Sequence, residues 1–251
     1  MLALEGKAYL VTGAARRVGA AIARRLHAAG GSVLVHYREN IGEAEALASA
    51  LNADRADSAF AVRLDLAETQ RLGELVKVAI DKFGRLDGLV NNASGYYPTP
   101  LGGITEANWQ DLTASNLKAP LFLAQAAAPA LRATRGAIVN IVDIHAERPL
   151  KDYLVYSVAK AGLAGLTRAL ALELAPEVRV NGVSPGPIAW PDARPDAVID
   201  AAERERILDS TPLKREGGVE AIADAVHYLM AGADFVTGQV LAVDGGRSIY
   251  L

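Results

Sequence analysis

Residues 7–31 read KAYLVTGAARRVGAAIARRLHAAGG, and this stretch decides the fold. Lys7 to Thr12 forms a short apolar run that ends at a glycine turn, which is typical of a buried strand. Apolar side chains recur at helical spacing from Ala20 to Ala29, and a Gly-Gly pair ends that helix. Gly13 permits a tight turn between the two elements, and Gly19 lets the helix approach the strand closely. The helix N-terminus then offers N–H groups to a pyrophosphate.

The glycine turn departs from the usual G-x-G-x-x-G spacing. It reads T-G-x-x-x-R-x-G, with Arg17 where a glycine is more common. Strand, glycine turn and helix in this order still predict a dinucleotide site. The expected cofactor contacts are Gly13, Arg16, Arg17, Val18 and Gly19.

Strand and helix patterns alternate along the rest of the chain without a linker or an internal repeat. Strands are predicted at 7–12, 32–37, 60–64, 86–90, 137–142, 178–183 and 239–243, and helices at 20–29, 41–51, 68–83, 105–131, 152–174, 196–209 and 217–231. This alternation predicts an α/β fold, a single Rossmann-type doubly wound parallel sheet of about seven strands with helices on both faces. We expect one reductase domain over residues 1–251, with a substrate lid at about 188–210, where prolines and Trp190 precede a charged helix.

Composition excludes several classes of function. The 251 residues carry a net charge of -3, which suggests no nucleic-acid partner. There are no cysteines, so disulfides, thiolate metal sites and a cysteine nucleophile are excluded. The four histidines lack the spacing of metal ligands, and we expect no metal site. No secretory signal or clean membrane span is visible, so we expect a cytoplasmic protein without a membrane partner.

The end of the second predicted strand bears on the choice of cofactor. It reads His36-Tyr37-Arg38, with no acidic residue before Glu39. An acid there would hold the ribose hydroxyls of NAD, whereas guanidinium groups suit a 2′-phosphate. We therefore expect NADPH, clamped by Arg17 and Arg38 with His36 nearby. The alternative is that Arg38 is a solvated loop charge.

Polar and aromatic residues follow the third and fourth predicted strands. Asp65, followed by Leu66, either accepts a hydrogen bond from adenine or caps the next helix. Asn92, Ala93 and Ser94 form a polar turn on the expected cofactor side. Two tyrosines, the first being Tyr96, then lie in a proline-bounded loop, where an aromatic face would hold a planar heterocycle against the nicotinamide. The alternative is a loop packed on the core.

Residues Ala137 to Lys160 carry the reaction chemistry. An apolar strand over 137–142 ends at Asp143, where open parallel sheets place their active sites. Tyr156 and Lys160 are four residues apart, which makes them neighbours on one face of a helix. A cation beside a phenol lowers its pKa and prepares it for acid–base work.

Two further segments contribute candidate site residues. Ser184-Pro185-Gly186-Pro187 is a rigid turn after the sixth strand, and we expect cofactor contacts from Pro185, Gly186 and Ile188. Trp190 follows as a substrate contact in the lid. Asn116 is expected on the polar side of the helix over 105–131.

Taken together, these motifs resemble the short-chain dehydrogenase/reductase family along essentially the whole chain. They are T-G-A-A-R-R-V-G, N-N-A-S, Asn116, the set Asp143/Tyr156/Lys160, S-P-G-P and V-D-G-G. Two residues depart from the family's commonest pattern: Arg17 replaces a glycine, and Asp143 replaces a serine. Both departures resemble pteridine reductases, as do the segments H-Y-R and Y-Y-P-T-P.

This resemblance implies reduction of a dihydro or oxidised pterin or folate by NADPH. Tyr156 is implied to protonate a ring nitrogen and Asp143 to partner it, while Lys160 binds the nicotinamide ribose and lowers the Tyr156 pKa. The other implied roles are a water chain ordered by Asn116, cofactor and pterin contacts from Ser94 and Arg17, and a pterin face covered by Tyr96. Relatives are usually tetramers, so we expect a homotetramer with residues 244–251 at an interface.

Two other functions stay open on the sequence. One is a carbonyl reductase of the same family acting on a ketone or a 3-oxoacyl substrate, which has no need of Asp143 or the Tyr96 loop. The other, of a different class, is a non-catalytic NADP-binding regulatory protein. The identity of the natural pterin, whether dihydrofolate, dihydrobiopterin or dihydromonapterin, also stays open.

Overall fold

The computed structural model describes residues 3–190 and 200–250. A single parallel sheet of seven strands runs through it in the order β3-β2-β1-β4-β5-β6-β7. The strands are β1 (Ala8–Val11), β2 (Ser32–Tyr37), β3 (Ala59–Arg63), β4 (Gly88–Asn91), β5 (Ala137–Ile141), β6 (Arg179–Pro185) and β7 (Val240–Val243). The predicted sheet of about seven parallel strands is confirmed.

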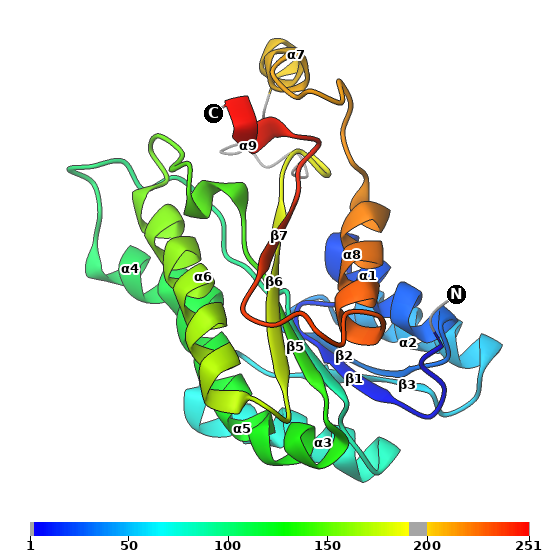
Figure 1. The fold of residues 1–251 in the computed structure, drawn as a ribbon. Coiled ribbons are helices and arrows are strands. Elements are labelled where there is room, and N and C mark those ends of the chain that lie inside the picture. The colour runs from blue at the N-terminus through cyan, green and yellow to red at the C-terminus, as the bar shows by residue number, and fades with distance from the viewer. Residues whose placement is uncertain (1–2, 191–199, 251) are drawn as a thin grey trace.

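Helices cover both faces of the sheet (Figure 1). One face carries α1 (Arg17–Ala28), α2 (Ile41–Asp54) and α8 (Val219–Ala231), and the other carries α3 (Leu72–Phe83), α5 (Ala119–Thr134) and α6 (Leu154–Leu174). The shorter elements are α4 (Glu106–Thr113), α7 (Ala201–Asp209), α9 (Arg247–Tyr250) and the 3-10 turns at Thr69–Arg71 and Ile144–Ala146. The predicted three-layer α/β architecture is therefore confirmed.

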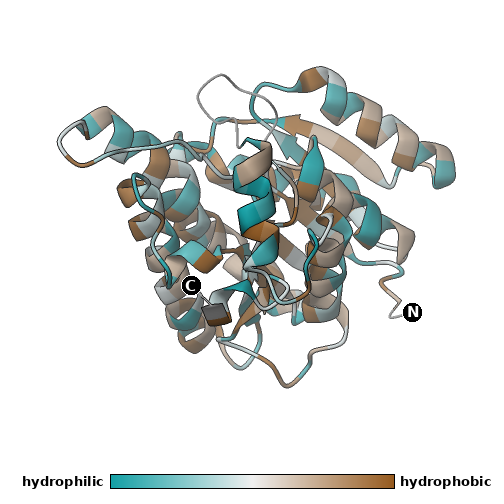
Figure 2. Ribbon diagram, turned by 90° about the horizontal axis from the view of Figure 1, so that it is seen from above, coloured by the Kyte–Doolittle hydropathy of each residue, from teal (hydrophilic) through white to brown (hydrophobic). Residues whose placement is uncertain are grey.

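The two cores follow from the alternation of side chains along buried strands. In β1, Tyr9 and Val11 face the core under α1 and α8, whereas Leu10 faces the core under α3 and α5. Because both faces are covered, both sets of side chains are apolar. Seen from above, apolar residues dominate the sheet, and hydrophilic ones lie mainly on the outer sides of helices (Figure 2).

The direction in which strands are added to the sheet changes at β1 and β4, which lie side by side. β1 pairs with β2 on one side and with β4 on the other, and successive strands are added outward in both directions. The connections after β1 and β4 therefore diverge at the carboxyl edge of the sheet. Such a switch point leaves a crevice at which open α/β sheets bind their ligands.

The predicted continuous helix over 105–131 is interrupted in the structure. α4 ends at Thr113, a π-helical segment covers Ala114–Lys118, and α5 continues from Ala119. Pro120 has no N–H and cannot close the α-helical hydrogen bond to the Asn116 carbonyl, which gives a local reason for the wider turn. The prediction that Asn116 lies on a polar helix face is wrong, because its side chain is only 1% exposed.

The described part of the predicted lid, residues 188–190 and 200–210, lies beyond the carboxyl edge of the sheet (Figure 1). α7 and the short C-terminal α9 both lie there, above the end of β6 (Figure 1). The helix predicted at 196–209 is present from Ala201, and residues 191–199 lie outside the described ranges. Among the described helices, none has the length and apolarity needed to cross a membrane.

Candidate active site

A cavity of about 1600 Å³ opens along the carboxyl edge of the sheet. Its walls hold every predicted site residue except Asn116, namely Gly13, Arg16, Arg17, Val18, Gly19, His36, Tyr37, Arg38, Asp65, Leu66, Asn92, Ala93, Ser94, Tyr96, Asp143, Tyr156, Lys160, Pro185, Gly186, Ile188 and Trp190. Single-ligand pockets occupy about 300–1,000 Å³, so this space is large enough for two ligands side by side.

The glycine turn has the close packing expected of a phosphate-binding turn. Gly13 has a positive φ of 61°, and a Cβ there would lie 2.9 Å from the Cα of Ala93. A Cβ on Gly19 would lie 2.3 Å from the Gly13 carbonyl oxygen. At the start of α1, Arg16 forms no side-chain cap and the first turn holds no acidic residue. The uncapped N–H groups of this helix suit an anion such as a pyrophosphate.

His36 supports the glycine turn from beneath. Its Nδ1 accepts a hydrogen bond from the Gly13 N–H at 3.1 Å, and its Nε2 donates to the Leu64 carbonyl at 3.0 Å. Burial lowers the pKa of His36 to about 4, so the ring is neutral at pH 7. A neutral His36 offers no charge to a 2′-phosphate, and its two hydrogen bonds position the glycine turn. The contact with the cofactor that the sequence analysis expects of it stays a prediction.

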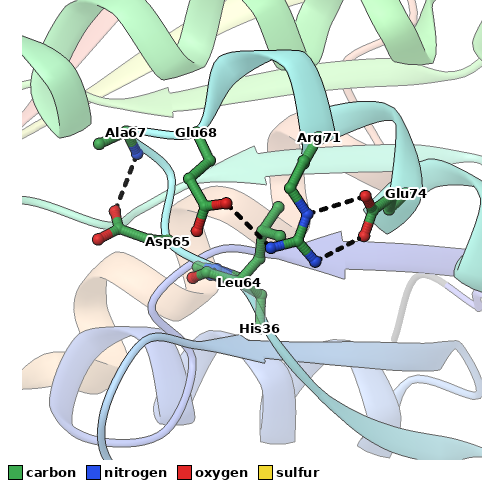
Figure 3. Close-up of polar contacts among 7 residues, drawn as sticks. All are labelled: His36, Leu64, Asp65, Ala67, Glu68, Arg71 and Glu74. Atoms are coloured by element: carbon green, nitrogen blue, oxygen red, sulfur yellow. Dashed lines mark hydrogen bonds and ion pairs between the residues drawn. The ribbon is translucent and has the colours of Figure 1, made fainter.

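The far end of the cavity, beside β2 and β3, carries exposed charged side chains. Arg38 pairs with Glu39 at 3.1 Å, and Arg63 Nε donates to the Arg38 carbonyl. Asp65 accepts a hydrogen bond from the Ala67 N–H at 2.9 Å, so it closes a local turn (Figure 3).

The helix-capping alternative for Asp65 is wrong. Figure 3 shows that the following segment is held by a separate cluster, in which Arg71 bridges Glu68 and Glu74. The residue flanking the 3-10 turn is Glu68, and α3 begins only at Leu72. Asp65 Oδ1 thus serves the local turn, and the residue forms part of the cavity wall.

Arg17 adopts a left-handed backbone conformation, with φ of 52°, at the place where a glycine is usual. Its Nη2 donates to the carbonyl oxygens of Ala189 at 3.3 Å and Trp190 at 3.1 Å. The Trp190 ring in turn stacks under the guanidinium of Arg204 at 5.3 Å. Arg17 and Arg38 both line the cavity, and the phosphate clamp expected of them stays a prediction.

The reaction centre lies at the ends of β4 and β5. The Tyr156 hydroxyl donates to Asp143 Oδ2 at 2.6 Å, and Asp143 Oδ1 accepts from the His145 N–H at 2.8 Å. Lys160 Nζ donates to the Ile141 carbonyl at 2.8 Å and lies 5.7 Å from the centre of the Tyr156 ring. The structure therefore brings together the three residues that the sequence placed in one centre.

Burial controls the protonation of this centre. The pKa of Tyr156 is raised well above its usual value, because burial and the neighbouring Asp143 both disfavour the phenolate, while a hydrogen bond with Ser94 acts in the opposite direction. Burial also lowers the pKa of Lys160 to about 8. The expected lowering of the Tyr156 pKa by Lys160 is therefore contradicted. Tyr156 keeps its proton at neutral pH, as a general acid must.

Three tyrosines form a row beside this centre. Tyr96 stacks on Tyr153 with ring centres 4.6 Å apart, and its ring meets that of Tyr156 edge-on at 4.9 Å. The Tyr96 loop thus reaches the reaction centre and lines the cavity rather than only packing on the core. Tyr153 was not predicted as a site residue, although its three-residue spacing from Tyr156 indicates that the two side chains lie on the same face of a helix.

Asn116 acts behind the cavity wall. Its Nδ2 donates to the carbonyls of Gly95 and Leu112, both at 2.9 Å, and its Oδ1 accepts from Ser94 Oγ at 2.8 Å. These contacts fix the side-chain amide and position Ser94, while the amide oxygen keeps one acceptor lone pair. The backbone carbonyl is also without its α-helical donor, because that donor would be the N–H that Pro120 lacks. The role of Asn116 in a water chain stays a prediction.

The last missed residue is Arg247, which lines the cavity on the lid side. It follows β7 by four residues, and a position just past the carboxyl end of a parallel strand was a usable signal. No cluster of three or more metal-binding side chains exists within residues 3–190 and 200–250. The site is thus a large cavity that contains the glycine turn with the uncapped start of α1, and, near its other end, the centre formed by Asp143, Tyr156 and Lys160.

Comparison with known proteins agrees with this geometry. A family model described as enoyl-(acyl carrier protein) reductase matches residues 13–248. Pteridine reductase 1 of Leishmania tarentolae is 39% identical over 96% of both chains. The chain belongs to the short-chain dehydrogenase/reductase family.

Membership of the short-chain dehydrogenase/reductase family makes the chain an oxidoreductase. Other members with similar sequences carry different names. A 3-oxoacyl-[acyl-carrier-protein] reductase of Staphylococcus aureus is 36% identical over 96% of this chain and 97% of its own. One from Synechocystis sp. is 34% identical over the full length of both. The comparisons therefore show the family and do not distinguish between substrates.

Proposed function

We propose that the protein reduces a C=N bond of a dihydro or oxidised pterin, with NADPH as the hydride donor. The observation that carries this proposal is the 2.6 Å hydrogen bond between the Tyr156 hydroxyl and Asp143. Reduction of an imine adds a hydride to carbon and a proton to nitrogen, so a proton donor must lie within hydrogen-bond reach. A carboxyl group next to the phenol adds a second proton carrier that a serine would not provide.

Each residue of the reaction centre has a separate role in this proposal. Tyr156 gives its proton to the ring nitrogen, and Asp143 replaces that proton from the solvent side of the cavity. The Tyr96 and Tyr153 rings form an aromatic wall beside the phenol, which suits a flat heterocycle. When bound, the nicotinamide supplies the hydride. Lys160, whose Nζ lies 5.7 Å from the centre of the Tyr156 ring, would hold the nicotinamide ribose.

The cofactor site fits a nicotinamide dinucleotide on two observations. The glycine turn leaves no room for further side chains, and the N-terminus of α1 is uncapped toward the cavity. The preference for NADPH rests on Arg38 and the absence of an acid at the end of β2. The remaining cofactor contacts are proposed for Asn92, Ala93, Pro185, Gly186 and Ile188.

Reduction of a 3-oxoacyl thioester is the second candidate, because similar relatives carry that name. A steady-state assay separates the two by following NADPH absorbance with 7,8-dihydrobiopterin, dihydrofolate and acetoacetyl-CoA. We expect turnover with the pterins to exceed that with the thioester by at least tenfold in kcat/KM. Preferential turnover of acetoacetyl-CoA would reject the proposal, and no turnover of any substrate would favour a non-catalytic role.

We add proposals on the domain organisation, the oligomeric state and the cellular location of the protein. We propose one catalytic domain over residues 1–251, closed over its substrate by the segment 188–210. A homotetramer in the cytoplasm is the proposed working form, which light scattering and cell fractionation would test. The exposed edge strand β7, where Leu241 is 42% exposed, is consistent with a contact between copies near the C-terminus.

A further inference from the structure

Arg247 lies where the C-terminal segment meets the lid helix. Its Nη1 donates to the Ile207 carbonyl at 3.0 Å and also contacts the hydroxyl of Ser210, both at the end of α7. The side chain is half-buried and forms part of the cavity wall. Both contacts use the same nitrogen. Among residues 3–190 and 200–250, none accepts a hydrogen bond from Nη2 or Nε, which leaves these two nitrogens for a planar, bidentate partner.

Two acidic side chains lie close to Arg247, and both are already engaged. Glu203 pairs with Arg206 on the same helix. Asp244 accepts hydrogen bonds from the N–H groups of Gly246 and Ser248, both at 2.8 Å. Within the described parts of the chain, no carboxylate comes within ion-pair distance of Arg247.

The Arg247 guanidinium lines the cavity, and the guanidinium of Arg204 stacks on Trp190, which also lines it. Burial is the largest influence on the Arg247 pKa and lowers it, so the guanidinium carries its charge in surroundings that disfavour it. A bound anion would relieve that cost, and carboxylate geometry matches the guanidinium fork.

We propose that Arg247 is a specificity residue that binds a carboxylate on the tail of the substrate. This inference rests on the proposed pterin reduction and deepens it. The pterin ring itself carries no carboxylate, so the anion must belong to its substituent, as in the glutamate of a folate. The favoured substrate is then a dihydrofolate-type pterin rather than one with a short neutral side chain.

A binding experiment tests the inference without requiring turnover. The NADP⁺-loaded protein is titrated calorimetrically with folate, which carries two carboxylates, and with biopterin, which carries none. Wild type, R247Q and R215Q are compared, since Arg215 is an exposed neighbour bonded only to the Glu216 carbonyl and lies outside the cavity. We expect R247Q to weaken folate binding about tenfold or more relative to biopterin, and R215Q to change neither.

Kinetics supply the second readout. For R247Q, KM for dihydrofolate is expected to rise at least tenfold more than KM for dihydrobiopterin, with similar kcat effects on both. Equal losses for both ligands would show a structural role and overturn the inference, as would unchanged folate binding. Selective loss of acetoacetyl-CoA binding would overturn it in favour of a thioester. If folate binding depends on Arg247 but no pterin is reduced, the inference survives and the proposed reaction fails.

Discussion

The two ends of the cavity hold their side chains in different ways. At the reaction end, Tyr156 and Lys160 are 4% and 2% exposed, and both form hydrogen bonds inside the protein. At the opposite end, beside β2, where the adenosine of the proposed cofactor would lie, Arg38 is mostly exposed, and its ion pair is with its own neighbour, Glu39. Buried groups have shifted pKa values and fixed positions, whereas exposed ones supply charge at little cost to stability. The difference separates the chemistry from the choice of cofactor.

The largest expected effect comes from removing the buried phenol hydroxyl of Tyr156, which tests whether the reaction end carries the chemistry. We expect Tyr156→Phe to lower kcat for dihydropterin reduction by about 10² to 10⁴, the range for loss of a positioned general acid. Phenylalanine keeps the edge-on contact with Tyr96, so NADPH binding, measured by fluorescence titration, should stay within twofold of wild type. Retained turnover would remove Tyr156 from the proton path.

The next test asks what Asp143 adds to the phenol. We expect Asp143→Ser to reduce kcat/KM for dihydropterins by about 10², since the second proton carrier is lost while a hydrogen-bonding hydroxyl remains. Asp143→Asn is the matched control, because it keeps the shape and removes the charge. If both variants reduce dihydrobiopterin at the wild-type rate, the carboxyl group plays no part in catalysis.

The contrast between the two ends also explains what the sequence alone could predict. Local patterns placed the strands correctly, and the residues following them, such as Asp143 and Ser94, necessarily lie at the same edge of a parallel sheet. The pair Tyr156 and Lys160 follows from helical spacing. These features depend on the order and period of the chain, which a single sequence contains.

What the sequence did not predict depends on contacts between distant segments. The bonds from Arg17 to Ala189 and Trp190 span more than 170 residues. The pKa of Tyr156 is raised, opposite to expectation, mainly by burial, which no local sequence pattern reports. Asn116 lies buried, 1% exposed, in a π-helical segment that no local pattern of the sequence predicted.

A third test measures the cost of burying Lys160. Its pKa is about 8 in the folded protein, against about 10.4 for an unfolded lysine, so between these values the unfolded chain binds more protons. The free energy of unfolding should therefore rise with pH across this window, by up to about 1.4 kcal/mol per pH unit from this group. Urea unfolding between pH 7.5 and 9.5 measures the slope. Lys160→Met should flatten it, and equal slopes in the two proteins would contradict the burial cost.

The smallest expected effect lies at the exposed end. Arg38→Ala should weaken NADPH binding by about tenfold, because a charged hydrogen bond to the 2′-phosphate is lost, while NADH binding stays unchanged. The matched control is Arg24→Ala, an exposed arginine on α1 outside the cavity. Dissociation constants from fluorescence titration at two salt concentrations add a second criterion, because an exposed charge contact weakens as salt rises. Equal losses for NADPH and NADH would mean that Arg38 supports the fold of the β2 end rather than the phosphate. The preference for NADPH over NADH would then have to come from Arg16 or Arg63. The choice of cofactor would still be made at the exposed end, but by an arginine other than Arg38.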